Sequence, residues 1–403
     1  MFRFVHCSDL HLGTAFSGLR KLAPEAAREL ALAPFAAFDR LADAAIGNRA
    51  LFMVLAGDVF DSGRPSLYAE SRFRDTLGRL DAAGIRVFWA RGNHDCEAEL
   101  AGLPANTAVF SPEKAEVFAV TAADGSVAAS VAGISHANPA EKRDLAPEVD
   151  SLLRDAPGFR LAVLHANIDG VPGYEPYAPA PLEELQMGHA DYWALGHIHR
   201  RRVLCERPAI AYSGSPQGRS VNEPGARGGF MVEVDDAGTP HLSTLDVQPV
   251  RVETLTLDDL ADVFGADELL RRFRDRLPEI REPLRLRLVL ASGTALNSRL
   301  RSADAAELEA LFSPVLRSKL PRAGLESVVV NTTALPSASR REGLAAEVAA
   351  VRGELDLAAE LEALPLAPSE FSGFSREELA GIAREAEELL LDYLCGDLRS
   401  AKL

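Results

Sequence analysis

Five short apolar runs in the first half of the chain each lead into a motif that carries metal-type ligands. They cover residues 2–7, 51–56, 85–90, 159–164 and 191–195. Their length and their content of Val, Ile, Leu and Phe are typical of buried β-strands, which predicts a layered α/β core. In such sheets ligands collect at the carboxyl ends of the strands. We therefore expect the five motifs to meet at one edge of the fold.

Seven side chains in these motifs have the chemistry of metal ligands. They are Asp9 and His11 in SDLH, Asp58 in GDVFD, Asn93 in GNHD, His165 in VLHAN, and His197 and His199 in GHIH. Two divalent ions about 3.5–4 Å apart can activate water, orient a phosphate and stabilise both the attacking and the leaving oxygen. Cations that close need a bridging carboxylate, for which Asp58 is the candidate. The set therefore predicts a two-metal hydrolytic centre.

The ligand types also limit the choice of metal. Four imidazoles disfavour magnesium, which prefers oxygen ligands, and favour manganese, iron or zinc, with manganese as the first choice. His94 and Asp61 remain outside this ligand set. They fit an acid that protonates or stabilises the leaving oxygen and a carboxylate that orients this acid.

The ordered series DxH, GDxxD, GNHD, H and GHxH resembles the motifs of the calcineurin-like metallophosphoesterases. The segments SDLHLG, LAGDVFD and WARGNHD are most similar to the DNA-repair exonuclease branch, which includes SbcD. The stretch at 212–229 resembles the YhaO-type members of that branch, and the similarity spans residues 1–230. It implies an α/β fold: a four-layer sandwich of two mixed β-sheets flanked by helices, with a small α+β capping domain and a helical C-terminal tail.

The resemblance also implies a role for each site residue. The first metal would be held by Asp9, His11, Asp58 and His199. The second metal would be held by Asp58, Asn93, His165 and His197. His94 takes the position of the family's catalytic histidine, outside the direct ligands. Asp61 stands where many phosphoesterases place the partner carboxylate of that histidine, and where some nucleases of the branch carry a histidine instead.

Charge gives a weaker indication of the substrate. The chain has 43 basic and 59 acidic residues, a net charge of −16, whereas nucleic-acid binders usually show a basic footprint. Two local basic positions lie next to the predicted metals, and Arg200 and Arg219 are therefore the candidates for contact with DNA phosphates. The remaining histidines, His6, His136, His189 and His241, are expected to be structural, although the loop of His136 could approach the site.

Three segments are expected along the chain. Residues 1–248 form the nuclease domain, 249–336 read as strand, helix, strand, helix, strand and form the capping domain, and 337–403 are helical and acidic. SREE at 375–378 is a capping box that opens a helix. One face of this helix is apolar and comprises Leu379, Ile382, Ala386, Leu389 and Tyr393. This stripe could dock a partner or pack on its own chain. No GxxxxGK[ST] sequence is present, which leaves the ATPase role to a coiled-coil partner of the SbcC-like class, and a homodimer is compatible with the sequence.

Composition indicates the compartment. The sequence has no stretch of about 18 apolar residues, as a membrane span needs. The first strand begins at Phe2, so no signal peptide is expected. Four scattered cysteines indicate no disulfide framework. These features predict a protein of the cytoplasm.

The combined prediction is a manganese-dependent DNA exonuclease of DNA repair. A small-molecule or nucleotide phosphoesterase on the same metal centre is the alternative within hydrolases. A non-catalytic subunit of a DNA-end complex is a third interpretation, against which the intact ligand set and His94 argue.

Overall fold

The computed structural model describes residues 1–16, 24–280, 282–334, 343 and 346. Contacts within the chain define two units. The first comprises Met1–Glu253, Ile280–Leu286 and Arg322–Glu326; the second comprises Thr254–Glu279, Arg287–Pro321 and the described residues from Ser327 onward. Apart from residues 343 and 346, the predicted helical tail at 337–403, with its apolar stripe, lies outside the described residues.

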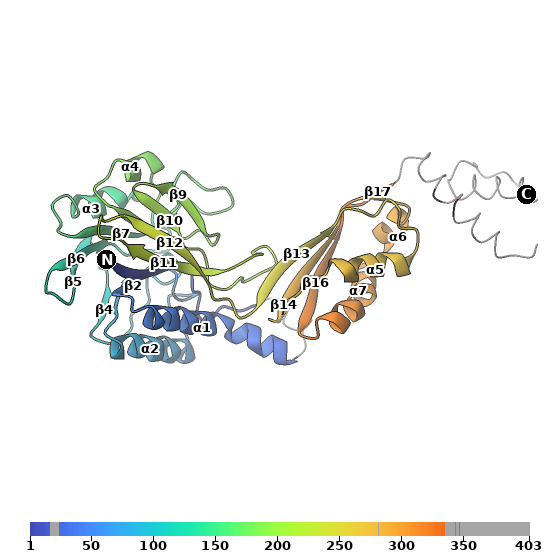
Figure 1. Ribbon diagram of the computed structural model, residues 1–403, viewed down its shortest axis with the longest axis horizontal. Coiled ribbons are helices and arrows are strands. Elements are labelled where there is room, and N and C mark those ends of the chain that lie inside the picture. The colour runs from blue at the N-terminus through green and yellow to red at the C-terminus, as the bar shows by residue number, and fades with distance from the viewer. Residues whose placement is uncertain (17–23, 281, 335–342, 344–345, 347–403) are drawn as a thin grey trace, which may run out of the picture. The chain divides into compact units, whose positions relative to one another are not determined.

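The first unit contains two mixed sheets of six strands each (Figure 1). The first sheet has the order β12-β11-β1-β2-β3-β4, in which β1 to β4 are parallel and β11 is antiparallel to both of its neighbours. Its strands are β1 Phe2–Cys7, β2 Phe52–Ala56, β3 Arg86–Ala90, β4 Thr107–Val109, β11 Gly228–Val234 and β12 Pro240–Asp246.

The second sheet has the order β5-β6-β7-β8-β10-β9. Its four inner strands are parallel, and the edge strands β5 and β9 pair antiparallel with them. The strands are β5 Glu116–Thr121, β6 Val127–Gly133, β7 Phe159–His165, β8 Tyr192–Gly196, β9 Arg202–Glu206 and β10 Ala209–Tyr212.

Side chains that alternate along the strands hold the layers together. Phe4 and Phe52 of the first sheet pack with Leu161 and Tyr192 of the second in one apolar cluster between the sheets. The rings of Phe4 and Tyr192 meet edge to face, with centroids 5.3 Å apart. Each such buried side chain contributes about 1.5–3 kcal/mol through apolar burial.

Helices cover the outer face of each sheet. The apolar faces of α1 Pro24–Gly47 and α2 Leu67–Ala82 pack on the first sheet, and those of α3 Ala146–Ser151 and α4 Leu182–Gln186 pack on the second. This four-layer arrangement confirms the predicted fold class. The five predicted strand runs are also confirmed, as β1, β2, β3, β7 and β8.

The second unit is an α+β assembly (Figure 1). The chain passes through a three-stranded sheet of order β13-β14-β16, and a short parallel pair of strands lies beside its helices. The elements are β13 Arg251–Leu257, α5 Ala266–Arg276, β14 Leu284–Leu290, β15 Gly293–Thr294, α6 Asn297–Ser302, α7 Ala305–Lys319, β16 Ala323–Val330 and β17 Thr333–Ala334. Phe273 of α5 and Phe312 of α7 are fully buried and pack edge to face. The assignment of this region as a capping domain stays a prediction.

None of the described helices combines the length and the apolar character that a membrane crossing requires.

Candidate metal centre

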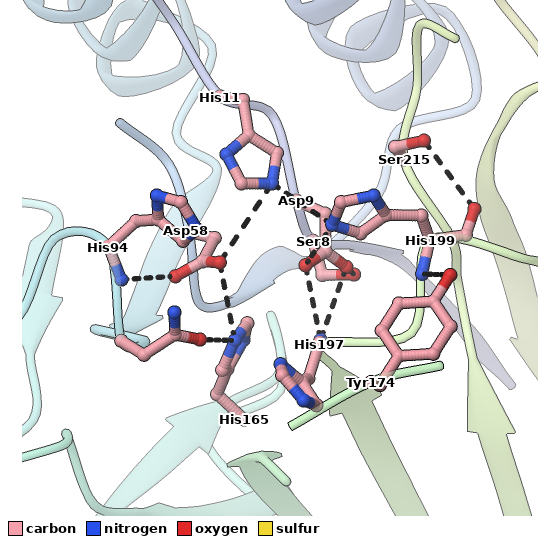
Figure 2. A network of polar contacts seen from close by, with 12 residues as sticks. Ser8, Asp9, His11, Asp58, His94, His165, Tyr174, His197, His199 and Ser215 are labelled. Carbon is pink, nitrogen blue, oxygen red and sulfur yellow. Dashed lines mark hydrogen bonds and ion pairs between the residues drawn. The ribbon is translucent and has the colours of Figure 1, made fainter. Parts of the chain in front are cut away.

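The loops that follow β1, β2, β3, β7 and β8 bring the predicted ligand side chains into one buried cluster (Figure 2). Ligand atoms of Asp9, His11 and His199 lie within 4.8 Å of one another, and so do those of Asp9, Asp58 and His165. The Nε2 atoms of His11 and His199 are 3.2 Å apart. Two adjoining groups of donors therefore share Asp9.

Asn93 and His197 complete the set of seven. Asn93 Oδ1 lies 3.0 Å from His165 Nε2, and the ring centroids of His165 and His197 are 5.2 Å apart. The backbone N–H of His197 donates to the Asp9 carboxylate at 3.1 Å. Because β1, β2 and β3 belong to one sheet and β7 and β8 to the other, the cluster takes ligands from both sheets.

The backbone is strained at several of these positions. Left-handed φ angles occur at Asp9 (53°), His11 (46°), Asp58 (52°) and His197 (96°). Such conformations cost of order 1–3 kcal/mol each for residues other than glycine, and they cluster at functional sites. The neighbouring glycines leave room for the side chains: a Cβ at Gly57 would lie 2.2 Å from His165 Nδ1, and one at Gly92 would lie 2.3 Å from Asp58 Oδ1.

Two of the imidazoles are oriented by backbone carbonyls. His165 Nδ1 lies 2.9 Å from the carbonyl oxygen of Ala56, and His197 Nε2 lies 2.8 Å from that of Glu175. A carbonyl oxygen can only accept, so the ring nitrogen that faces it carries the proton. The other nitrogen, His165 Nε2 or His197 Nδ1, can then offer a lone pair to a metal.

The other two imidazoles are oriented by carboxylates. His11 Nδ1 lies 3.0 Å from Asp61 Oδ1, and His199 Nδ1 lies 2.7 Å from Glu223 Oε1. The same argument places the protons on Nδ1, which leaves the two facing Nε2 atoms as donors. Metal-binding histidines usually have such an oxygen partner at the outer nitrogen, because it fixes the tautomer and the ring orientation.

Asp58 and His165 form the strongest electrostatic pair of the cluster. Asp58 Oδ2 lies 3.4 Å from His165 Nε2, and both side chains are buried. Burial lowers the pKa of His165, but the Asp58 carboxylate outweighs it and raises this pKa to about 9. Burial would raise the pKa of Asp58, yet the charge of His165 holds it well below its usual range. Metal binding at this position must therefore displace a proton from His165.

His94 and Asp61 lie next to the cluster but are arranged differently from the prediction. The backbone N–H of His94 donates to Asp58 Oδ1 at 2.9 Å, and its Nδ1 lies 3.2 Å from the backbone carbonyl of Asp61. The Asp61 carboxylate is 3.9 Å from His94 Nδ1 but 3.0 Å from His11 Nδ1. Asp61 thus contacts His94 through its backbone and His11 through its side chain.

The two candidate arginines differ in their surroundings. Arg219 forms an ion pair with Asp61 at 3.1 Å, and its guanidinium lies 3.4 Å from His199 Nδ1. Arg200 follows His199 directly and is exposed. Within the described residues it makes no hydrogen bond or ion pair with the cluster. Arg219 is therefore part of the site's polar network, whereas Arg200 is free to meet a ligand from solvent.

The remaining histidines have structural partners. His6 Nδ1 lies 3.0 Å from the Tyr192 hydroxyl, and its Nε2 lies 3.1 Å from the carbonyl of Leu195. His136 does approach the site: its Nε2 donates to the backbone carbonyl of His165 at 2.6 Å. This contact supports the strand end from behind and does not add a ligand.

Three residues at the site were not predicted from the sequence. Asp95 is fully buried and accepts hydrogen bonds from the backbone N–H groups of Val59 (2.7 Å) and Gly92 (2.7 Å), which ties two ligand loops together. Its place in GNHD was an available signal. The Tyr174 hydroxyl accepts from the backbone N–H of His199 at 3.2 Å. Glu223 is the third, and no spacing in the sequence marks it.

The donor set fits a centre of two divalent metals. It combines carboxylate, amide and imidazole groups in one buried cluster, with an outer proton acceptor for each of the four imidazoles. Without cations this many buried donors would be costly to hold together. Imidazole-rich sites suit manganese, iron or zinc better than magnesium.

Removing metal with a chelator is expected to lower the melting temperature of the protein. A ligand that binds only the folded state at 100 times its Kd stabilises by about 2.7 kcal/mol. For a domain of 150–250 residues this corresponds to a shift of roughly 5–11 °C. Differential scanning fluorimetry with EDTA, followed by re-addition of Mn²⁺, measures it. Identical melting curves in both states would contradict a structural contribution of the metals.

Comparison with known proteins agrees with this geometry. The family model for calcineurin-like phosphoesterases matches residues 2–201. The uncharacterized metallophosphoesterase YhaO of Bacillus subtilis is 33% identical over 305 residues, which cover 72% of this chain and 72% of that protein.

Two named DNA-processing proteins are similar at lower identity. The DNA double-strand break repair protein Mre11 of Methanopyrus kandleri is 27% identical over 296 residues, covering 68% of this chain and 62% of that protein. The SbcD component of the nuclease SbcCD of Escherichia coli K12 is 25% identical over 326 residues, covering 68% and 74%. These relatives, together with the fold and the donor cluster, show that the chain is a metal-dependent hydrolytic enzyme and belongs to the calcineurin-like phosphoesterase family.

Proposed function

We propose that this protein is a manganese-dependent DNA nuclease, acting as an exonuclease in DNA repair by a two-metal mechanism. The seven-residue donor cluster carries the proposal of phosphodiester hydrolysis. DNA as the substrate is supported by the extent of the similarity to the SbcD component of SbcCD. It covers 68% of this chain, which is more than the residues 2–201 of the family model.

In this proposal the ligands divide between two metals that share Asp58. The first metal is held by Asp9, His11, Asp58 and His199, and the second by Asp58, Asn93, His165 and His197. Two bound divalent ions supply a nucleophilic water at neutral pH and positive charge for the phosphate oxygens. Asp58 suits the shared position because its Oδ2 lies 3.4 Å from His165 Nε2 and 3.8 Å from His11 Nε2.

His94 is the proposed proton donor to the leaving oxygen. Its Nδ1 faces the carbonyl oxygen of Asp61 at 3.2 Å, so this nitrogen keeps a proton and Nε2 is the atom that exchanges one with the substrate. The side chain is 38% exposed, which lets a substrate reach it. Asp61 orients His94 through its backbone.

Arg200 and Arg219 are the proposed contacts to DNA phosphates. Arginine binds phosphate oxygens through paired N–H donors, and such contacts position the backbone without reading sequence. The acidic balance of the chain makes local cations beside the metals necessary for attracting DNA.

The proposed partners are DNA and an ATPase of the coiled-coil, SbcC-like class, in a protein of the cytoplasm. The name of the SbcCD relative and the missing P-loop sequence in this chain support the ATPase. The apolar stripe from Leu379 to Tyr393 remains the proposed docking segment, and a homodimer is proposed as well.

A small-molecule or nucleotide phosphoesterase is the second candidate function. It is favoured by the relative at 33% identity, whose name assigns it to the metallophosphoesterases without naming a nucleic acid.

Digestion assays with the manganese-loaded protein distinguish the two functions. We expect progressive shortening of end-labelled single- or double-stranded DNA, together with slower hydrolysis of bis-nitrophenyl phosphate. The Asp58→Ala variant, purified in the same way, controls for contaminating nucleases. Hydrolysis of the small phosphodiester or of nucleotides with no DNA degradation would overturn the nuclease proposal. No hydrolysis of any substrate by the metal-loaded protein would point to a non-catalytic subunit.

A further inference from the structure

Two imidazoles of the cluster are held from behind in a nearly symmetric way. The Nε2 atoms of His11 and His199 face each other at 3.2 Å. On the outer side, His11 Nδ1 contacts the Asp61 carboxylate at 3.0 Å, and His199 Nδ1 contacts the Glu223 carboxylate at 2.7 Å. Each imidazole is therefore placed between its partner ring and a carboxylate.

Arg219 connects the two carboxylates. Its guanidinium lies 3.1 Å from Asp61 Oδ1 and 3.9 Å from Glu223 Oε1. Its backbone N–H also donates to Glu223 Oε2 at 2.8 Å. One cation thus offsets the repulsion between two partly buried acids that lie behind the same pair of histidines.

The position of Arg219 is itself fixed by a buried ion pair of the first unit. Arg285, at the start of β14, is 2% exposed and donates to the Arg219 carbonyl at 3.0 Å. The same guanidinium pairs with Glu326 of β16 at 2.6 Å. A continuous set of polar contacts therefore runs from these strands to the two imidazoles.

We propose that Glu223 is a positioning residue for a metal ligand: it holds His199 in the tautomer and orientation that the first metal needs, as Asp61 does for His11, with Arg219 joining the two carboxylates. This inference rests on the proposed division of ligands between two metals. It adds a function for Glu223, which lies between β10 and β11, outside the five ligand motifs. Partners of this kind typically change metal affinity or activity by about 10- to 100-fold when they are removed.

Metal titration of paired variants of the full chain tests the proposal. In Glu223→Ala the His199 Nδ1–H loses its acceptor, so one of the two Mn²⁺ ions should bind about 10- to 100-fold more weakly by isothermal titration calorimetry. Glu223→Gln should retain most of the affinity, because the amide oxygen accepts the same hydrogen bond. Glu233→Ala is the matched control, since this glutamate pairs with Arg3 on a surface strand.

Electron paramagnetic resonance provides a readout that general destabilisation would not change. The wild type and Glu223→Gln should show the exchange-coupled signal of a manganese pair at two equivalents. Glu223→Ala should show mainly the six-line signal of isolated Mn²⁺ under the same conditions. If the alanine variant does not fold, Asp61→Ala, at a more exposed carboxylate, tests the mirror contact with His11 in the same way.

The outcomes separate this inference from the nuclease proposal. Two ions bound by Glu223→Ala with wild-type affinity, and an unchanged coupled signal, would overturn the positioning role. A wild-type protein that binds two ions but degrades no DNA would overturn the nuclease proposal while the Glu223 effect on metal binding stands.

Discussion

Replacing Asp58 by alanine is expected to remove both metals and reduce hydrolysis by about 10³- to 10⁵-fold. Asp58 is the candidate bridge, and it contacts three parts of the site: the N–H of His94 at 2.9 Å, His165 Nε2 at 3.4 Å and His11 Nε2 at 3.8 Å. Its loss leaves two close cations without a shared anion, so their mutual repulsion is uncompensated. Metal-ion catalysis supplies several kcal/mol, and each 1.36 kcal/mol corresponds to about a factor of ten in rate.

Metal content by mass spectrometry and turnover of bis-nitrophenyl phosphate measure this effect. Asp58→Asn is the matched variant: it keeps the shape and an acceptor for the His94 N–H but lacks the charge, and it should fall between wild type and alanine. In the same assay His199→Ala should mainly affect the first ion and His197→Ala the second. An Asp58→Ala protein that retains two tightly bound manganese ions would show that the bridge is elsewhere.

Replacing His94 by asparagine is expected to slow hydrolysis by about 10²- to 10⁴-fold, the usual contribution of general acid catalysis. Binding of both metals and of DNA should persist, because the site receives only the backbone N–H of His94, and the asparagine variant still donates this N–H to Asp58. The side chain of His94 acts through Nε2, while Nδ1 is held by the Asp61 carbonyl.

Single-turnover rates, metal stoichiometry and DNA affinity of the His94→Asn variant separate these contributions. Asp61→Asn provides a comparison, because Asp61 contacts His94 through its backbone and its carboxylate faces His11. This variant should therefore weaken metal binding more than His94→Asn does. Loss of metal in His94→Asn would place His94 among the direct ligands, and near-normal turnover would exclude it from the mechanism.

The ligand cluster was predictable because each motif is local. A buried strand is marked by a short apolar run, and a ligand that directly follows a parallel strand must reach the carboxyl edge of its sheet. This reasoning places Asp9, Asp58 and His165 together without knowledge of the contacts between them. The strained backbone at Asp9 and Asp58 was not predictable, because aspartate only modestly favours left-handed φ.

The partners of the ligands were not predictable, because they depend on contacts between segments far apart in the chain. Asp61 was expected to orient His94 through its carboxylate. Its place only three residues after Asp58 could not show that the carboxylate faces His11, 50 residues earlier in the chain. His136 was recognised as a loop histidine near the site, but only the structure shows it donating to the His165 carbonyl.

The sequence by itself determined which of the ligand-bearing strands exist, which motif follows each of them, and which side chains can donate to a metal. Those properties follow from residue type and from the two-residue period of a strand, both of which are local. Only the tertiary structure decided the proton positions and the supports. Glu223 reaches His199 and Arg285 reaches Arg219 because separate segments pack against each other there. Such contacts are set by the packing of the whole first unit, which no spacing along the chain encodes.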